Sequence, residues 1–155
     1  MKYSDQIAAW LLEMGYTHCF FVSGGNSMHL VESLSRKLDC RAVIHEVAAG
    51  IAAEYFNETS SEGKALALVT AGPGLTNITT AIAGAYLESR ELLVIGGQVK
   101  VSDLSLGKLR QNGIQEIDGV SIASPICVKS ETMTSTWDMN KFQNFITSTD
   151  NGKKS

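Results

Sequence analysis

The sequence predicts an α/β fold in which a parallel β-sheet is covered by helices on both faces. Short, uniformly apolar runs alternate along the chain with longer segments whose apolar residues recur at helical spacing. Apolar runs without polar alternation are typical of strands that are buried on both faces. Strictly alternating strands and helices favour parallel pairing through right-handed helical crossovers. At 155 residues the chain has the size of one domain with its own core.

The elements follow one another in a regular order. A Ser4-Asp5 start and a stop at Gly15 bound the first helix, and a Ser135-x-x-Asp138 pattern is expected to cap the last one. Between residues 100 and 119 the periodicity fades, which indicates a long functional loop. The expected strands are 19–22, 41–44, 65–69 and 92–95, and the expected helices are 4–14, 26–38, 47–57, 75–88 and 135–147.

Composition limits the possible partners. The formal charge of −3 provides no basic surface for nucleic acid or anionic membranes, and no apolar run approaches the ~20 residues that span a bilayer. The N-terminus lacks the pattern of a signal peptide, so we expect a cytoplasmic protein without nucleic-acid or membrane partners. The three cysteines lack the spacing of a metal site, and we expect them to be reduced, buried thiols.

Candidate ligand contacts lie where the expected strands end, because open α/β sheets bind ligands at the carboxyl ends of their strands. One such loop, residues 72–77, is a glycine-rich turn before a helix. A dinucleotide fingerprint would need a third glycine where Asn77 stands and an acidic residue after the next strand. A tight strand-to-helix turn is therefore the default interpretation, and a nucleotide-binding domain is a weaker alternative.

Glu46 is the candidate for proton chemistry. It follows an apolar strand directly and precedes small residues that allow close helix packing. An acid in the first helical turn is also favoured by the helix dipole, but that effect explains an exposed glutamate rather than one at a buried strand end. We expect Glu54 and Glu58, further along the same helix, to be solvated. The three histidines, His18, His29 and His45, are expected to be structural.

Five motifs in order resemble the N-terminal pyrimidine-binding domain of acetolactate synthase-like enzymes, which depend on thiamine diphosphate. The resemblance covers nearly the whole chain, and a match of five motifs in register is far more specific than any one of them. The motifs are VSGG (22–25), HEVAAGIAAEY (45–55), TAGPGLTN (70–77), GQV (97–99) and QEID (115–118).

The resemblance implies a role for each motif. Glu46 would hydrogen-bond N1′ of the cofactor's aminopyrimidine and favour its imino form, which takes the proton from C2 of the thiazolium ring. The substrate would be a 2-oxo acid that is decarboxylated and ligated to a second compound. Gln115 would lie near the reacting carbon, and Gln98 would line the substrate cavity or hold its strand end. The residues expected to contact the cofactor are Ser23, Gly24, Glu46, Gly72, Pro73 and Asn77.

The resemblance also implies that the site is incomplete. Residues 1–130 form the pyrimidine-binding domain, residues 131–155 form a C-terminal helix and the start of a linker, and the diphosphate-binding domain is absent. The Gly-Asp-Gly and Asn-Asn motifs that bind Mg²⁺ and the diphosphate do not occur, so no metal ligand is expected on this chain. We expect a homodimer or a complementary diphosphate-binding domain or subunit, with the isolated chain inactive and most simply a fragment.

Two departures from the family bear on the substrate. The acetolactate synthases usually have Tyr-Pro-Gly-Gly where this chain has residues 22–25, and no histidine follows His45. The histidine pair of pyruvate decarboxylase-like members is therefore missing, which favours a carboligase or an atypical lyase. The alternative is a non-catalytic dimerisation or regulatory module of the same fold.

Overall fold

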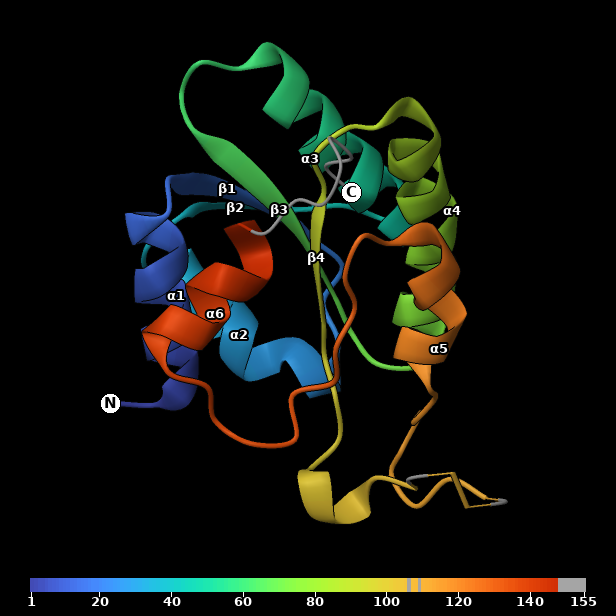
Figure 1. Cartoon of the computed structure of the whole chain (residues 1–155). Coiled ribbons are helices and arrows are strands. Elements are labelled where there is room, and N and C mark those ends of the chain that lie inside the picture. The colour runs from blue at the N-terminus through green and yellow to red at the C-terminus, as the bar shows by residue number, and fades with distance from the viewer. Residues whose placement is uncertain (106, 109, 148–155) are drawn as a thin grey trace.

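The fold is centred on a four-stranded, all-parallel sheet (Figure 1). The structure is a computed structural model that describes residues 1–105, 107–108 and 110–147. The strands are β1 (Tyr16–Phe21), β2 (Asp39–Ala42), β3 (Lys64–Val69) and β4 (Leu93–Gly96), in the order β2-β1-β3-β4. This confirms the predicted α/β fold with a parallel sheet. The tail, residues 148–155, to which we assigned the start of the linker, lies outside the described residues.

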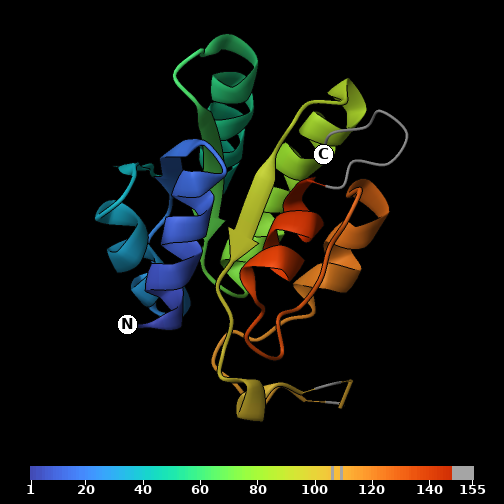
Figure 2. The ribbon, with the colours of Figure 1, turned by 60° about the vertical axis from the view of Figure 1, so that its left-hand side comes forward.

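Helices cover both faces of the sheet, as the views in Figures 1 and 2 agree. The apolar side chains of α1, α2 and α6 gather on one face, and those of α3 and α4 gather on the other. The α-helices are α1 (Tyr3–Glu13), α2 (Met28–Ser35), α3 (Glu46–Thr59), α4 (Pro73–Glu88), α5 (Gly119–Ala123) and α6 (Met139–Thr147), and the 3₁₀ turns are η1 (Gly25–Ser27), η2 (Val101–Asp103) and η3 (Ser124–Ile126).

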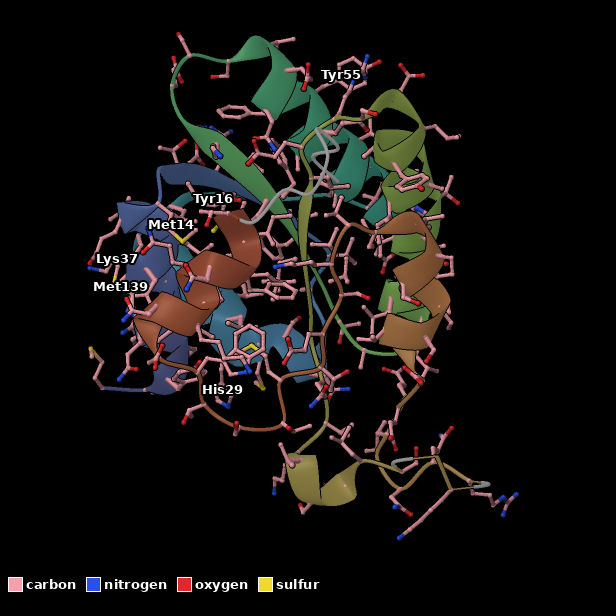
Figure 3. The ribbon with its side chains drawn as sticks, in the orientation of Figure 1. Met14, Tyr16, His29, Lys37, Tyr55 and Met139 are labelled. Carbon is pink, nitrogen blue, oxygen red and sulfur yellow. The ribbon has the colours of Figure 1, made fainter. Side chains whose placement is uncertain are left out.

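Strand β3 divides the core between the two faces. Leu66 and Leu68 pack with α1, α2 and α6, whereas Ala65, Ala67 and Val69 pack with α3 and α4. Successive side chains of a strand point to opposite faces, so a continuous apolar run supplies both layers. The larger residues face the first layer, where the fully buried Tyr16 also lies; it is labelled in Figure 3. The alanine face lets α3 and α4 approach the sheet closely.

The predicted elements occur with shifted ends. The expectation that every strand is buried on both faces was wrong for β2, where Asp39, Arg41 and Ala42 are exposed because β2 is an edge strand. The helix expected over 26–38 begins with η1 and ends at Ser35. The predicted cap of the last helix was also misplaced: it is Asp138, whose Oδ1 accepts from the backbone N–H of Lys141 at 2.7 Å.

Within the described residues, no helix is both long enough and apolar enough to span a membrane.

Candidate cofactor site

The candidate site lies at the carboxyl ends of β1 and β3. These strands are neighbours, but the chain visits β2 on the outer side of β1 before it returns to form β3. The chain thus leaves β1 toward one side of the sheet and leaves β3 toward the other. A sheet of this order has its ligand crevice at such a topological switch point. The loops after β1 and β3 contain Ser23, Gly24, Gly72 and Pro73.

Glu46 is the first residue of α3 and is buried, with only 7% of its surface exposed. Its Oε2 accepts a hydrogen bond from Nδ2 of Asn77 on α4 at 2.9 Å. Its Oε1 accepts no hydrogen bond from any residue that the structure describes, and no basic side chain in that part of the chain pairs with it. The helix N-terminus provides a positive dipole end next to the carboxylate. One oxygen of Glu46 is therefore held in place while the other remains available.

His45 is the N-cap that starts α3. Its Nδ1 accepts from the backbone N–H of Val47 at 3.2 Å, and its ring is exposed. This contact fixes the start of the helix and so the position of Glu46. The structural role expected for His45 agrees with this contact.

Two glycines, one from the loop after β1 and one from the start of α4, pack against Thr70. A Cβ atom at Gly24 would lie 2.4 Å from Cβ of Thr70, so only glycine fits there. A Cβ atom at Gly74 would lie 3.0 Å from Cγ2 of Thr70 and 3.7 Å from Oε1 of Glu46. Thr70 thus lies between the two loops, and Gly74 lies between Thr70 and Glu46. The absence of side chains at Gly24 and Gly74 lets the backbone pack closely against Thr70.

The hydroxyl of Thr70 has no hydrogen-bond partner. It is the one buried side-chain polar atom in this situation among the residues that the structure describes. Buried polar groups in folded proteins are nearly always satisfied, so an exception needs an explanation. Sequence analysis did not single out Thr70, although a threonine at the end of a buried strand, just before a glycine-rich turn, was a usable signal.

The loop before α5 brings Gln115 to the same place. Gly72 has a φ of +62°, and a Cβ atom there would lie 2.5 Å from the backbone oxygen of Gln115. Gln115 itself has a φ of +59°, a conformation that few non-glycine residues adopt. Nδ2 of Asn26 donates to the backbone oxygen of Ile114 at 3.3 Å. The loops after β1, after β3 and before α5 therefore meet, with the side chain of Gln115 exposed.

Glu116 holds this loop in shape from within. Its carboxylate accepts from the backbone N–H groups of Ser105, Asn112 and Gly113. These hydrogen bonds, the one from Ser105 above all, lower the pKa of the Glu116 carboxyl below its usual value. A charged Glu116 therefore ties together two stretches of the loop expected over 100–119, and it indirectly positions Gln115.

The remaining predicted site residues take different places. Ser23 is exposed in the loop after β1. Pro73 is exposed as the first residue of α4, where its missing N–H costs no hydrogen bond. Gln98 follows β4, and its Nε2 donates to the backbone oxygen of Met133 at 3.5 Å. This weak contact favours the interpretation in which Gln98 holds its strand end; its role toward a substrate stays a prediction.

Glu54 corrects one expectation. It is not solvated but buried, at 4% exposure, and its Oε1 accepts from Nη1 of Arg90 at 3.0 Å. The guanidinium of Arg90 lies 4.7 Å from the ring centre of Tyr55, which is labelled in Figure 3. The helical spacing did not reveal this pairing because Arg90 comes from the turn after α4. Glu58 is exposed, as expected.

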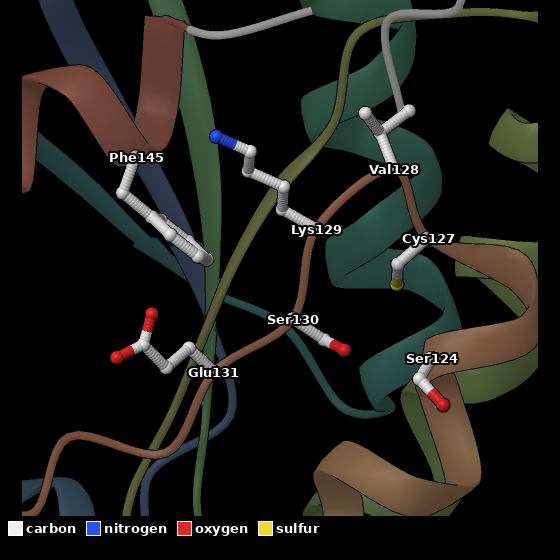
Figure 4. A pocket seen from close by; sticks show the side chains of 7 residues that line it. All are labelled: Ser124, Cys127, Val128, Lys129, Ser130, Glu131 and Phe145. Carbon is white, nitrogen blue, oxygen red and sulfur yellow. The ribbon is translucent and has the colours of Figure 1, made fainter. Parts of the chain in front are cut away.

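A separate cavity of about 410 Å³ lies between α6 and the segment after α5 (Figure 4). It is lined by Phe145 and by residues from Ser124 to Glu131, and it shares no residue with the loops around Glu46. It is therefore not part of the candidate site. Among the residues that the structure describes, no cluster of three or more His, Cys, Asp or Glu side chains could hold a metal ion.

Comparison with known proteins identifies relatives with the same domain. The family described as thiamine pyrophosphate enzyme, N-terminal TPP binding domain, matches residues 1–122. The acetolactate synthase large subunit of Buchnera aphidicola is 32% identical over 88% of this chain and 23% of its own length. That of Lactococcus lactis is 36% identical over 79% of this chain and 21% of its own. Human 2-hydroxyacyl-CoA lyase 2 is 34% identical over 79% of this chain and 19% of its own.

The chain spans about a fifth of the length of these curated relatives. The matched residues 1–122 include Glu46 and every loop that surrounds it. The chain therefore belongs to the thiamine pyrophosphate enzyme family, within which it corresponds to the N-terminal TPP-binding domain.

Proposed function

We propose that this chain is the pyrimidine-binding part of a thiamine-diphosphate-dependent enzyme of the acetolactate synthase type, which acts on a 2-oxo acid. The observation that carries the proposal is the buried Glu46, which has one oxygen bound by Asn77 and the other available. A buried carboxylate without a basic partner is costly unless another group binds it. A protonated ring nitrogen of the aminopyrimidine would be such a group.

The residues around Glu46 fit an aminopyrimidine. The ring is flat and carries nitrogen donors and acceptors along its edge, which suits a carboxylate and a hydroxyl beside glycine backbone. Glu46 would hold N1′, and the unpartnered hydroxyl of Thr70 would serve a second polar atom of the cofactor. Gly24 and Gly74 let the loops after β1 and β3 pack closely around Thr70. When bound, thiamine diphosphate supplies the carbanion chemistry that amino-acid side chains cannot supply.

The residues of this chain would control a proton rather than perform the bond cleavage. Asn77 fixes one oxygen of Glu46, so the other has a defined direction. That oxygen would hold the proton at N1′ and so bias the tautomer of the ring. Gln115 would reach the substrate from the loop that packs on Gly72. This arrangement assigns proton control to the chain and leaves the diphosphate and Mg²⁺ to another domain.

We further propose that activity requires a complementary diphosphate-binding domain, and that the isolated chain is inactive. The chain matches only about a fifth of the length of its relatives, and it lacks the motifs that bind Mg²⁺ and the diphosphate. Large apolar side chains near the candidate site are exposed, as expected of a surface that another domain covers. These are Met28, Ile44 and Ile114.

Calorimetry with thiamine diphosphate and Mg²⁺ tests this proposal. The diphosphate-binding half of an acetolactate synthase large subunit is mixed with this chain, and each half is also titrated alone. We expect tight binding only in the mixture, and we expect Glu46→Gln to weaken the binding at least about tenfold, since a charge-assisted hydrogen bond contributes roughly 1.5–3 kcal/mol. Glu58→Gln, on the exposed face of the same helix, is the matched control and should bind like the unaltered chain.

Turnover of a 2-oxo acid by the same mixtures gives the second measurement. Full turnover with Glu46→Gln would contradict the role assigned to the carboxylate. If no mixture binds the cofactor while this chain still associates with the other half, the chain is instead a non-catalytic interaction module of the same fold. The retained, buried Glu46 favours the enzyme over this alternative.

A further inference from the structure

Cys19 and Cys40 form a pair of thiols that the proposed function does not use. Cys19 lies on β1 and Cys40 on β2, and the two residues are direct partners in the parallel pairing of these strands. In-register neighbours point to the same face of a sheet, and both side chains pack with the core under α1 and α2. Both cysteines are free thiols.

The spacing of the two strands suits a covalent link. Neighbouring strands lie about 4.7–4.9 Å apart, and disulfides join residues whose Cα atoms are about 4.4–6.8 Å apart. Because Cys19 and Cys40 are directly opposite each other in the register of β1 and β2, their side chains lie next to each other on the same face of the sheet. The separation of paired strands therefore falls within the range that a disulfide can bridge.

The two thiols differ in access and in acidity. Cys19 is fully buried, whereas Cys40 lies on the edge strand and is partly exposed. The neighbouring Cys19 thiol, with a smaller effect of Ser35, outweighs burial and the nearby Asp39 and lowers the pKa of Cys40 to about 7. The neighbouring Cys40, together with burial, raises the pKa of Cys19. Cys40 is thus the nucleophile of the pair, because the thiolate is the reactive form of cysteine.

We propose that Cys19 and Cys40 are a redox-sensitive pair that forms an intrachain disulfide by exchange with a small-molecule disulfide such as oxidised glutathione. The thiolate of Cys40 attacks one sulfur of the reagent, a Cys40–glutathione bond forms, and one glutathione thiolate leaves. The thiol of Cys19 then loses its proton to solvent and attacks Sγ of Cys40, and the second glutathione thiolate leaves. Both cysteines are oxidised and one molecule of the reagent is reduced to two thiols.

The position of the pair links it to the candidate site. Cys19 lies within β1, which is followed by the loop with Ser23, and Cys40 lies within β2, which is followed by the start of α3 at Glu46. The disulfide would close a loop that contains Ser23, Gly24 and α2. It would also connect β1 and β2, the strands that lead into the loop with Ser23 and Gly24 and into the start of α3 with Glu46, whether or not the chain binds thiamine diphosphate.

Mass spectrometry of the folded chain tests the pair directly. The chain with Cys127→Ser, which retains only these two cysteines, is incubated with oxidised glutathione near neutral pH and then alkylated. We expect both alkylatable thiols to be lost together and the chain to become lighter by two hydrogen atoms. Trypsin should release residues 3–36 linked to residues 38–41, and dithiothreitol should separate them.

The variants separate a pair from a single reactive cysteine. Cys19→Ala should stop at the glutathione adduct on Cys40, and Cys40→Ala should leave the buried Cys19 unmodified. In the unaltered chain, Cys127 is the matched control: burial raises its pKa, and it should stay out of the cross-link. If the Cys127→Ser chain accumulates the adduct on Cys40 without the linked peptides, or does not react at all, the proposal is wrong, and this holds even if Cys19→Ala does not fold.

Discussion

Thr70 is the residue whose surroundings are least explained by folding alone. Its hydroxyl is buried without a partner, and Gly24 and Gly74 pack closely against its side chain. Leaving a buried hydroxyl unsatisfied costs roughly 1–3 kcal/mol of stability. A chain that keeps such a group gains nothing from it in isolation. The arrangement is consistent with a hydroxyl that acquires its partner only when the cofactor binds.

Thr70→Val should therefore have effects of opposite sign on stability and binding. Valine keeps the shape of threonine and removes the unpaired hydroxyl, so we expect the free energy of unfolding to rise by about 1 kcal/mol in urea titrations. In the mixture with a diphosphate-binding domain, the affinity for thiamine diphosphate should fall roughly fivefold to tenfold.

Thr79→Val is the control for this prediction. The hydroxyl of Thr79 donates to the backbone oxygen of Leu75 at 3.1 Å, so its removal gives up a hydrogen bond and should not stabilise the chain. Equal changes in the free energy of unfolding for the two variants would contradict the account of Thr70.

The sequence predicts the identity of the central carboxylate but not its environment. Glu46 stands out because it follows a buried strand and precedes small residues, and the family resemblance assigns it a role. Its partner Asn77 is 31 positions away, and only the packing of α3 against α4 brings them together. Glu54 shows the converse. Its position on the helix predicted an exposed side chain, but it is buried and forms an ion pair with Arg90, which follows α4.

At the scale of elements, the contact of α3 with α4 positions Glu46 relative to Asn77. Gly50 lies at the closest point, where a Cβ atom would come within 2.4 Å of Cβ of Ala81 and 3.0 Å of Cδ1 of Ile78. The two helices can approach this closely because the facing residues are small. The prediction that small residues at the start of this helix allow close packing is thus confirmed.

Gly50→Ala should push the two helices apart. Alanine is favoured over glycine in a helix by about 1 kcal/mol, but overpacking of a core costs about 1–3 kcal/mol. We expect the free energy of unfolding to fall by about 1–2 kcal/mol in urea titrations.

Gly84→Ala is the matched control on α4. A Cβ atom at Gly84 would meet nothing within 4 Å, so only the gain in helix propensity remains. We expect the free energy of unfolding to rise by about 0.5–1 kcal/mol. A stabilising Gly50→Ala would show that α3 and α4 are not packed as closely as described.

Whether a segment forms a helix or a strand was predictable, because the spacing and number of its apolar residues reflect burial. The residues at which helices and strands begin and end were not predictable in this way. The start of α6 depends on a hydrogen bond from Lys141 to Asp138, and Ser135 was an equally good cap by composition. The exposed β2 could not be distinguished from the inner strands, since its place at the edge follows from the order in which the strands pair. The short α5 and η3, on the same face as α4, carry too few residues for a periodic signal.

At the scale of the whole molecule, large apolar side chains are exposed at both ends of the sheet, but only one end carries the candidate site. Ile44 follows β2, is fully exposed and lies two residues before Glu46, at the carboxyl end of the strands. Leu87 is 80% exposed in the last turn of α4, a helix that starts at Pro73 beside the candidate site and runs toward the opposite end. If a diphosphate-binding domain covers the site, it covers the surface around Ile44 and leaves Leu87 in solvent.

Ile44→Ser and Leu87→Ser should therefore differ in association and agree in stability. Both side chains are exposed in the isolated chain, so we expect each variant to keep its free energy of unfolding within about 0.5 kcal/mol. Burial of an isoleucine against a partner contributes roughly 1.5–3 kcal/mol, so Ile44→Ser should weaken association with a diphosphate-binding domain at least about tenfold, measured by calorimetry. Leu87→Ser should associate like the unaltered chain. Equal losses of affinity for both variants, or no loss for Ile44→Ser, would mean that the partner does not cover the carboxyl end of the sheet. The proposal that a second domain completes the site around Glu46 would then be wrong.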